Sequence, residues 1–333
     1  MALMNKCAAV IGGLGITASV AMAQTSTIRI DGSSTVYPVT EAVVEEFSAA
    51  SRGKVKLTIG VSGTGGGFKK FARGEIDISN ASRPISTGEM EEAAKNGVEY
   101  LELPVCFDAL TVVVNTQNDW AKTMTVAELK KIWEPGAQGT ITKWNQIRPE
   151  WPNEKIDLYG PGTDSGTFDY FTEAVCGKAK ASRGDYAASE DDNVLVQGVE
   201  GSKFSLGYFG FSYFSAHAKR LTPVAIDNGK GGVLPSNEAV IAGTYNPLSR
   251  PLFIYVNKKA LQERPEVKQF VEFYLENVKE LAAEVKYTPL PDSAYEAVKS
   301  RFAKLQTGTV FGGHSETGLT IDDIVKRETK TGK

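Results

Sequence analysis

Hydrophobic and polar positions alternate along the chain between two periods, in short segments that follow one another. Strand-like runs, apolar or alternating with a period of two, lie at 27–30, 54–59, 76–78, 110–115, 156–159 and 252–256. Segments with helical periodicity lie at 42–47, 68–71, 168–175 and 266–278. Strands that alternate with helices in this way predict an α/β fold. A chain of 333 residues exceeds what one hydrophobic core usually supports, so we expect two lobes.

Three of these strands end in a loop rich in Gly, Ser and Thr, and a helix follows each loop. The loops are 31–35, 60–67 and 160–167. At a helix N-terminus the first N–H groups have no partner within the helix, and the helix dipole is positive there, so such a loop suits an anion. Any one loop is also compatible with ordinary capping by a single Ser, Thr or Asp. Because each loop carries several hydroxyl groups, the three together favour an anion site.

The N-terminus has the pattern of an export signal. A single lysine precedes an apolar stretch from Ala8 to Val20, and Ala21-Met22-Ala23 is a small-x-small cleavage site. We expect residues 1–23 to be a signal peptide that is cleaved after Ala23. A retained membrane anchor is the alternative reading of the same segment.

Two cysteines then remain in the mature chain, Cys106 and Cys176. In an oxidising compartment such a pair is expected to form a disulfide, which would contribute roughly 4 kcal/mol through loop closure. The alternative is two separate buried thiols.

Composition narrows the possible function classes. The formal net charge is −3, which gives no electrostatic footprint for nucleic acid. The chain has two histidines, His217 and His314, neither near an acid motif, and it has no Gly-x-Ser-x-Gly segment. Nucleophilic catalysis and zinc chemistry are therefore disfavoured, and no Walker-type loop indicates nucleotide binding. We expect neither an enzyme nor a cofactor.

Several segments, in their order along the chain, resemble the phosphate-binding protein of the bacterial high-affinity phosphate ABC transporter, the PstS family. The four main ones are Gly32-Ser33-Ser34-Thr35-Val36-Tyr37-Pro38, Ser62-Gly63-Thr64-Gly65-Gly66, Ala81-Ser82-Arg83-Pro84-Ile85-Ser86 and Gly160-Pro161-Gly162-Thr163-Asp164-Ser165-Gly166-Thr167-Phe168. Two further stretches, 141–145 and 248–252, also resemble recurring segments of the family. The similarity runs from about residue 28 to beyond residue 255, and the combination of segments is specific.

The resemblance implies an α/β, periplasmic binding protein-like fold of type II, with two lobes joined by two crossing strands and a ligand cleft between them. Lobe 1 would comprise residues 24–107 plus 252–333, and lobe 2 residues 108–251. Family members bind one inorganic phosphate, without a cofactor, and deliver it to an ABC transporter permease in the inner membrane. The resemblance thus implies a periplasmic receptor, which we expect to be a monomer that binds no nucleic acid.

Carried over by position, the phosphate ligands of the family fall on the three loops. They are Ser34, Thr35 and the amide of Val36 from the first loop, Thr64 (or Ser62, by a shifted alignment) from the second, and Ser165, Gly166 and Thr167 from the third. Two departures concern charge: some family members have Asp where Ser82 stands and Arg where Pro161 stands. A related family pattern has an Arg in the position of Arg83, so we predict that Arg83 supplies the positive charge.

With Ser82 in place of an acid, the group that accepts the proton of phosphate must lie elsewhere. A buried acceptor favours phosphate over sulfate, which has no proton to donate. Asp164 is the first candidate and Asp192 the second, although Asp164 is also placed to cap its helix. Three alternatives stay open: a receptor of the same fold for sulfate, molybdate, tungstate or arsenate, a phosphoester-handling enzyme, and a phosphate-binding protein used for sensing or adhesion.

Overall fold

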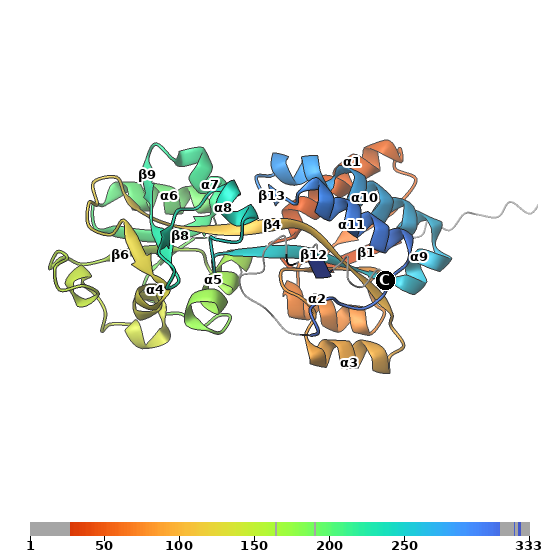
Figure 1. The fold of residues 1–333 in the computed structure, drawn as a ribbon, viewed down its shortest axis with the longest axis horizontal. Coiled ribbons are helices and arrows are strands. Elements are labelled where there is room, and N and C mark those ends of the chain that lie inside the picture. The colour runs from red at the N-terminus through yellow and green to blue at the C-terminus, as the bar shows by residue number, and fades with distance from the viewer. Residues whose placement is uncertain (1–26, 164, 190, 314–322, 324–325, 328–333) are drawn as a thin grey trace, which may run out of the picture.

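The computed structural model describes residues 27–163, 165–189, 191–313, 323 and 326–327. Two α/β lobes lie side by side, and two long strands run from one lobe into the other (Figure 1). The two-lobed α/β fold predicted from the sequence is therefore confirmed. The expected signal peptide, residues 1–23, lies outside the described residues.

Lobe 1 has a sheet that is covered by helices on both faces. Strand β1 pairs in parallel with β2 on one side and β3 on the other. Helices α1 and α10 lie on one face of these strands, and α2 and α3 lie on the other (Figure 1). The elements of this lobe are β1 (Thr27–Gly32), α1 (Tyr37–Ala50), β2 (Lys56–Ile59), α2 (Gly63–Ala72), β3 (Ile78–Ala81), α3 (Thr87–Lys95), α9 (Lys258–Glu263), α10 (Pro265–Glu284), β13 (Thr288–Pro289) and α11 (Asp292–Ala303).

Lobe 2 is also built from parallel strands and helices, and it has a second sheet. Strand β6 pairs in parallel with β7 and β8, and a second, small sheet has the order β11-β10-β5. The elements of this lobe are β5 (Thr123–Thr125), α4 (Val126–Trp133), β6 (Asp157–Gly160), α5 (Gly166–Cys176), β7 (Ala187–Ala188), α6 (Asp192–Gly201), β8 (Ser205–Gly210), α7 (Phe211–His217), β9 (Leu221–Pro223), β10 (Ala225–Asp227), β11 (Gly232–Val233) and α8 (Asn237–Ile241). Two short 3₁₀ turns, Pro135–Ala137 and Trp144–Gln146, lie between α4 and β6.

The crossing strands are β4 (Tyr100–Asn115) and β12 (Ser249–Asn257), which run antiparallel. All 16 residues of β4 are buried, as expected for a strand covered on both faces. Its first part pairs with β12 as far as Ala109, and from Leu110 onward it pairs with β8 of lobe 2. This change of partner supports a division of the chain near residue 108, and the lobe boundaries themselves stay a prediction.

Each of the three strand–loop–helix units expected from the sequence is present: β1 leads to α1, β2 to α2 and β6 to α5. One detail differs, because the glycines at 63–67, expected in a loop, form the first turns of α2. A Cβ on Gly67 would lie 2.6 Å from Cα of Gly32 and 2.8 Å from Oγ of Ser79. The missing side chain thus lets the start of α2 lie directly on the ends of β1 and β3.

The predicted disulfide is wrong, because both cysteines are free thiols. Cys106 is fully buried on β4, where it pairs with Leu252 of β12 and Pro289 of β13 in the sheet of lobe 1. Cys176 is the last residue of α5 in lobe 2. The two thiols belong to different lobes, and burial raises the pKa of both of them.

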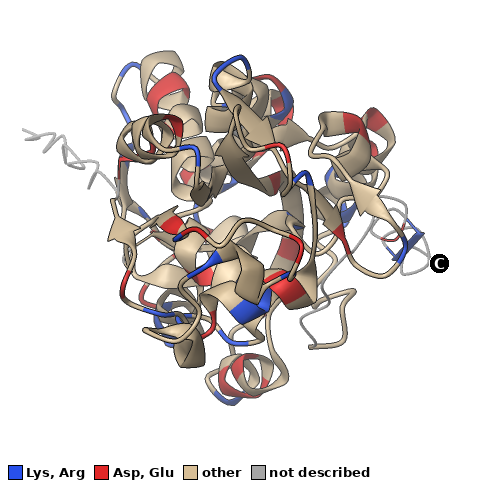
Figure 2. Cartoon of the chain, turned by 90° about the vertical axis from the view of Figure 1, so that its left-hand side faces the viewer, with Lys and Arg blue, Asp and Glu red and all other residues tan. Residues whose placement is uncertain are grey.

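In the described part of the chain, no helix combines the length and the apolar character that a bilayer span needs. Lys and Arg residues are interspersed with Asp and Glu residues on the side turned to the viewer in Figure 2. This mixed distribution agrees with the small net charge of the sequence.

Candidate functional site

The first loop leaves the carboxyl end of β1 and is held there by backbone and side-chain contacts. The amide of Ser33 donates to the carbonyl of Asn80, at the end of the neighbouring strand β3, over 2.9 Å. The amide of Thr35 donates to Oγ of Ser33 at 3.2 Å, and the hydroxyl of Tyr287 donates to the carbonyl of Thr35 at 2.8 Å. The carboxyl ends of parallel strands are the usual ligand sites of α/β folds.

The start of α5 in lobe 2 faces this first loop directly. Ser165 is the N-cap of α5, and its Oγ accepts a hydrogen bond from the amide of Thr167 at 3.1 Å. A Cβ on Gly166 would overlap the hydroxyl oxygens of both Ser34 and Thr35. The positive end of the α5 dipole therefore points at two hydroxyl groups of the opposite lobe. Residues of the first and third predicted loops are thus brought together.

Residues of the second loop meet those that follow β3. Oγ1 of Thr64 lies 3.0 Å from Oγ of Ser82, and it accepts a hydrogen bond from the amide of Ser82 at 3.2 Å. Ser62, the alternative to Thr64, instead donates from its amide and its Oγ to Asp31, over 3.0 and 2.6 Å. Ser62 thus has a hydrogen-bond partner within lobe 1, while the side chains of Thr64 and Ser82 contact each other.

Arg83 follows Ser82 and has a carboxylate partner. Its two terminal nitrogens donate to the two oxygens of Glu89 at 2.8 and 2.9 Å, and one also donates to the carbonyl of Pro84. Burial alone would raise the pKa of Glu89, but the hydrogen bonds from Arg83 and Ser86 outweigh it and lower that pKa. The charge of Arg83 is therefore compensated locally, and its predicted contact with phosphate stays a prediction.

A second cation, Arg250 on the crossing strand β12, lies at the junction of the first loop and α5. Its Nη2 donates to Oγ1 of Thr35 at 3.0 Å and lies 3.4 Å from the carbonyl oxygen of Gly166. Its guanidinium carbon lies 3.7 Å from the centre of the Tyr170 ring. Sequence reasoning did not assign this residue to the site, although an arginine shortly before the apolar run 252–256 was a usable signal.

Asp108 on β4 lies opposite Arg250 in the antiparallel pair of crossing strands. Its Oδ2 is 3.6 Å from Nη2 of Arg250, which is an ion pair but too long for a hydrogen bond. This oxygen is buried and has no hydrogen-bond partner among the described residues, and the same holds for Nε of Arg250. Burial raises the pKa of Asp108, and the charge of Arg250 offsets only part of that rise.

Between the lobes, next to these residues, lies a small cavity of about 70 Å³. Thr167 and Asp192 contribute to its wall from lobe 2, Tyr287 from lobe 1, and Asp108 from the crossing strand. Asp192, the second candidate for the proton acceptor, thus lies near the predicted ligands. Asp164, the first candidate, lies outside the described residues.

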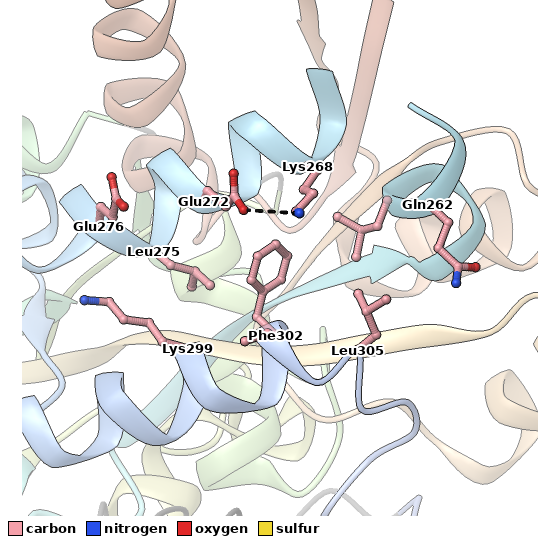
Figure 3. A pocket seen from close by; sticks show the side chains of 10 residues that line it. Gln262, Lys268, Glu272, Leu275, Glu276, Lys299, Phe302 and Leu305 are labelled. Atoms are coloured by element: carbon pink, nitrogen blue, oxygen red, sulfur yellow. Dashed lines mark ion pairs between the residues drawn. The ribbon is translucent and has the colours of Figure 1, made fainter. Parts of the chain in front are cut away.

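A groove of about 740 Å³ lies elsewhere on lobe 1. It runs between α9, α10 and α11, and Leu275 and Phe302 point into it while the ion pair of Lys268 and Glu272 lies at its edge (Figure 3). None of the predicted phosphate ligands lines this groove. Among the described residues, no group of three or more His, Cys, Asp or Glu side chains could hold a metal ion.

Comparison with known proteins shows the family and the fold of this chain. Residues 18–278 match the family described as PBP superfamily domain. The chain is 53% identical to Protein SphX of Synechocystis, over 95% of this chain and 94% of that protein. It is 35% identical to the phosphate-binding protein PstS of Staphylococcus saprophyticus, over 91% of this chain and 86% of that protein.

Among solved structures, the chain is similar to one described as a possible phosphate binding protein from Planctomyces limnophilus. The TM-score is 0.77 and the sequence identity 50%, and the match covers 85% of this chain and 99% of that one. The periplasmic binding protein fold of type II is thereby confirmed. With a superfamily match over most of its length and a PstS relative of this identity, the chain belongs to the PstS family of phosphate-binding proteins.

Proposed function

We propose that this chain is a receptor that captures inorganic phosphate between its two lobes and delivers it to the permease of an ABC transporter. The observation that supports this most strongly is the meeting of Ser34 and Thr35 of lobe 1 with the N-terminus of α5 in lobe 2. Hydroxyl groups, the amides at the start of α5 and a buried arginine there offer donors from both lobes to one anion.

Binding would couple to closure, because a ligand that contacts both lobes favours the closed state by its differential affinity for it. The proposed ligand set is the one predicted from the sequence: Ser34, Thr35, Val36, Thr64, Ser82, Asp164, Ser165, Gly166 and Thr167, with an arginine that supplies the positive charge, for which the sequence predicted Arg83. We propose no catalytic role, because the PstS relatives of this chain are named as binding proteins.

The same proposal includes the cellular location, the oligomeric state and the lobe boundaries of the receptor. The chain would be exported to the periplasm, cleaved after Ala23, and act as a monomer. Lobe 1 would comprise residues 24–107 and 252–333, and lobe 2 residues 108–251. The exchange of strand partners in β4 near residue 109 supports these boundaries.

Calorimetric titration of the purified protein with phosphate, sulfate and molybdate tests the proposal. We expect tight, stoichiometric binding of phosphate and much weaker binding of the other two anions. The variant Thr35→Val should bind phosphate at least tenfold more weakly, since it removes a hydroxyl donor from the site. Preference for sulfate or molybdate would assign another tetrahedral oxyanion, and indifference to all three would refute the proposal.

A further inference from the structure

We propose that Arg250, on the crossing strand β12, is the cation that binds the anionic ligand, and that it does so while holding both lobes. This rests on the proposed phosphate-binding function and names the residue that supplies the charge. Sequence comparison pointed to Arg83 for that role, and the contacts of the two arginines decide between them.

The two terminal nitrogens of Arg83 already have a charged partner. Both of its terminal nitrogens make hydrogen bonds to the carboxylate of Glu89, in the fork geometry that an oxyanion would otherwise occupy. Glu89 is in turn fixed at the start of α3, where it accepts from the amide and the hydroxyl of Ser86. An anion that binds these two nitrogens side by side would have to displace a carboxylate that is held from two sides.

Arg250 is bound less tightly to its charged partner, because its ion pair with Asp108 includes no hydrogen bond. Its Nη2 contacts neutral oxygens, those of Thr35 and Gly166, and its Nε is buried without a hydrogen-bond partner among the described residues. Its carboxylate neighbour, Asp108, stays at 3.6 Å and makes no hydrogen bond to it. The guanidinium thus keeps donors that a phosphate oxygen can accept from.

The burial and the location of Arg250 also favour it over Arg83 as the cation that binds the ligand. The Arg250 side chain is 10% exposed and the Arg83 side chain is 25% exposed, so solvent screens the charge of Arg250 less. Arg250 also contacts both lobes at once, Thr35 of lobe 1 and the α5 residues Gly166 and Tyr170 of lobe 2. A ligand that binds this guanidinium therefore binds at the place where the lobes meet. Asp108 acts as a positioning residue, because it lies opposite Arg250 on the paired strand.

The test compares phosphate affinity, measured by calorimetry, for Arg250→Gln and Arg83→Gln. We expect Arg250→Gln to weaken phosphate binding by about 100-fold and Arg83→Gln by less than about tenfold. The matched control is Arg148→Gln, which removes a bidentate partner of Glu128 in lobe 2 and should bind phosphate like the wild type. An equal or greater loss in Arg83→Gln would overturn the proposal.

Because Arg250 is buried, Arg250→Gln could fail to fold, and Arg250→Lys then serves instead. A lysine keeps the charge, but it lacks the planar fork that contacts Thr35 and lies over Tyr170. We expect a loss of about tenfold for this variant, and wild-type affinity would overturn the proposal. If the wild-type protein bound no tetrahedral anion, the proposed function would fail as well. If the wild type bound phosphate and Arg250→Gln bound it equally, only the role of Arg250 would be refuted.

Discussion

Gly166 lies where the two lobes meet, and its replacement by alanine tests the site without adding or removing a charge. The new Cβ would overlap the hydroxyls of Ser34 and Thr35 by about 1 Å relative to ordinary van der Waals contact. The first loop and α5 must then separate by about that distance. Losing one or two hydrogen bonds to a charged ligand, at about 1.5–3 kcal/mol each, weakens binding by about 10- to 100-fold or more.

The same substitution should leave the stability of the fold unchanged or slightly higher, since alanine is a better helix former than glycine by up to about 1 kcal/mol. Gly88→Ala is the matched control, because Gly88 also lies in the first turn of a helix, α3, and a Cβ there has no neighbour within 4 Å. Calorimetry would give the phosphate affinity and thermal unfolding the stability. Wild-type affinity in Gly166→Ala, or a fall in Tm together with the affinity, would refute the reasoning.

Three further predictions concern stability. Gly67→Ala should destabilise lobe 1 by at least about 2 kcal/mol, because its Cβ meets the backbone of Gly32 at 2.6 Å, and a Tm within 1 °C of wild type would contradict this. Hydrogen bonds from Arg183 lower the pKa of Asp185 to about 2, below its value near 4 in an unfolded chain. The pair therefore stabilises the folded state fully above pH about 4, and this stabilisation is lost as the pH falls through about 2. Asp185→Asn should thus remove about 1 kcal/mol of stability at neutral pH and much less at pH about 2, measured by denaturant unfolding, since the carboxylate is 37% exposed and partly screened. After denaturation without reductant, two thiols per mature chain should react with a thiol reagent. Adding a reductant should not shift the Tm of the protein. Titration of fewer than two thiols would contradict the free cysteines.

Much of the fold was predictable because the signals are local. Helix α1 buries Val43 and Phe47, the residues whose spacing predicted it, and β12 buries the whole apolar run 252–256. The strand–loop–helix units could be placed for the same reason, since each loop lies between a strand signal and a helix signal. That Thr35 and Gly166 meet could be expected only through the family resemblance, because no local pattern states which loops face each other.

The roles of individual polar side chains were less predictable, since partners distant in sequence decide them. Arg250 and Asp108 face each other only because β4 and β12 pair in one antiparallel register. Ser62 donates a hydrogen bond to Asp31, and Arg83 forms an ion pair with Glu89. Neither pairing follows from spacing or composition. The disulfide failed as a prediction for a similar reason, because cysteine count says nothing about the lobe on which each thiol lies.

The central claim is that one phosphate binds where the first loop, the start of α5 and Arg250 converge. A crystal structure of the protein grown with phosphate tests this most directly. We predict one tetrahedral anion within hydrogen-bond distance of Oγ1 of Thr35, of an amide at the N-terminus of α5 and of the guanidinium of Arg250. An anion bound only in the groove between α9 and α11, or lobes that stay apart around an unoccupied cleft, would contradict the account.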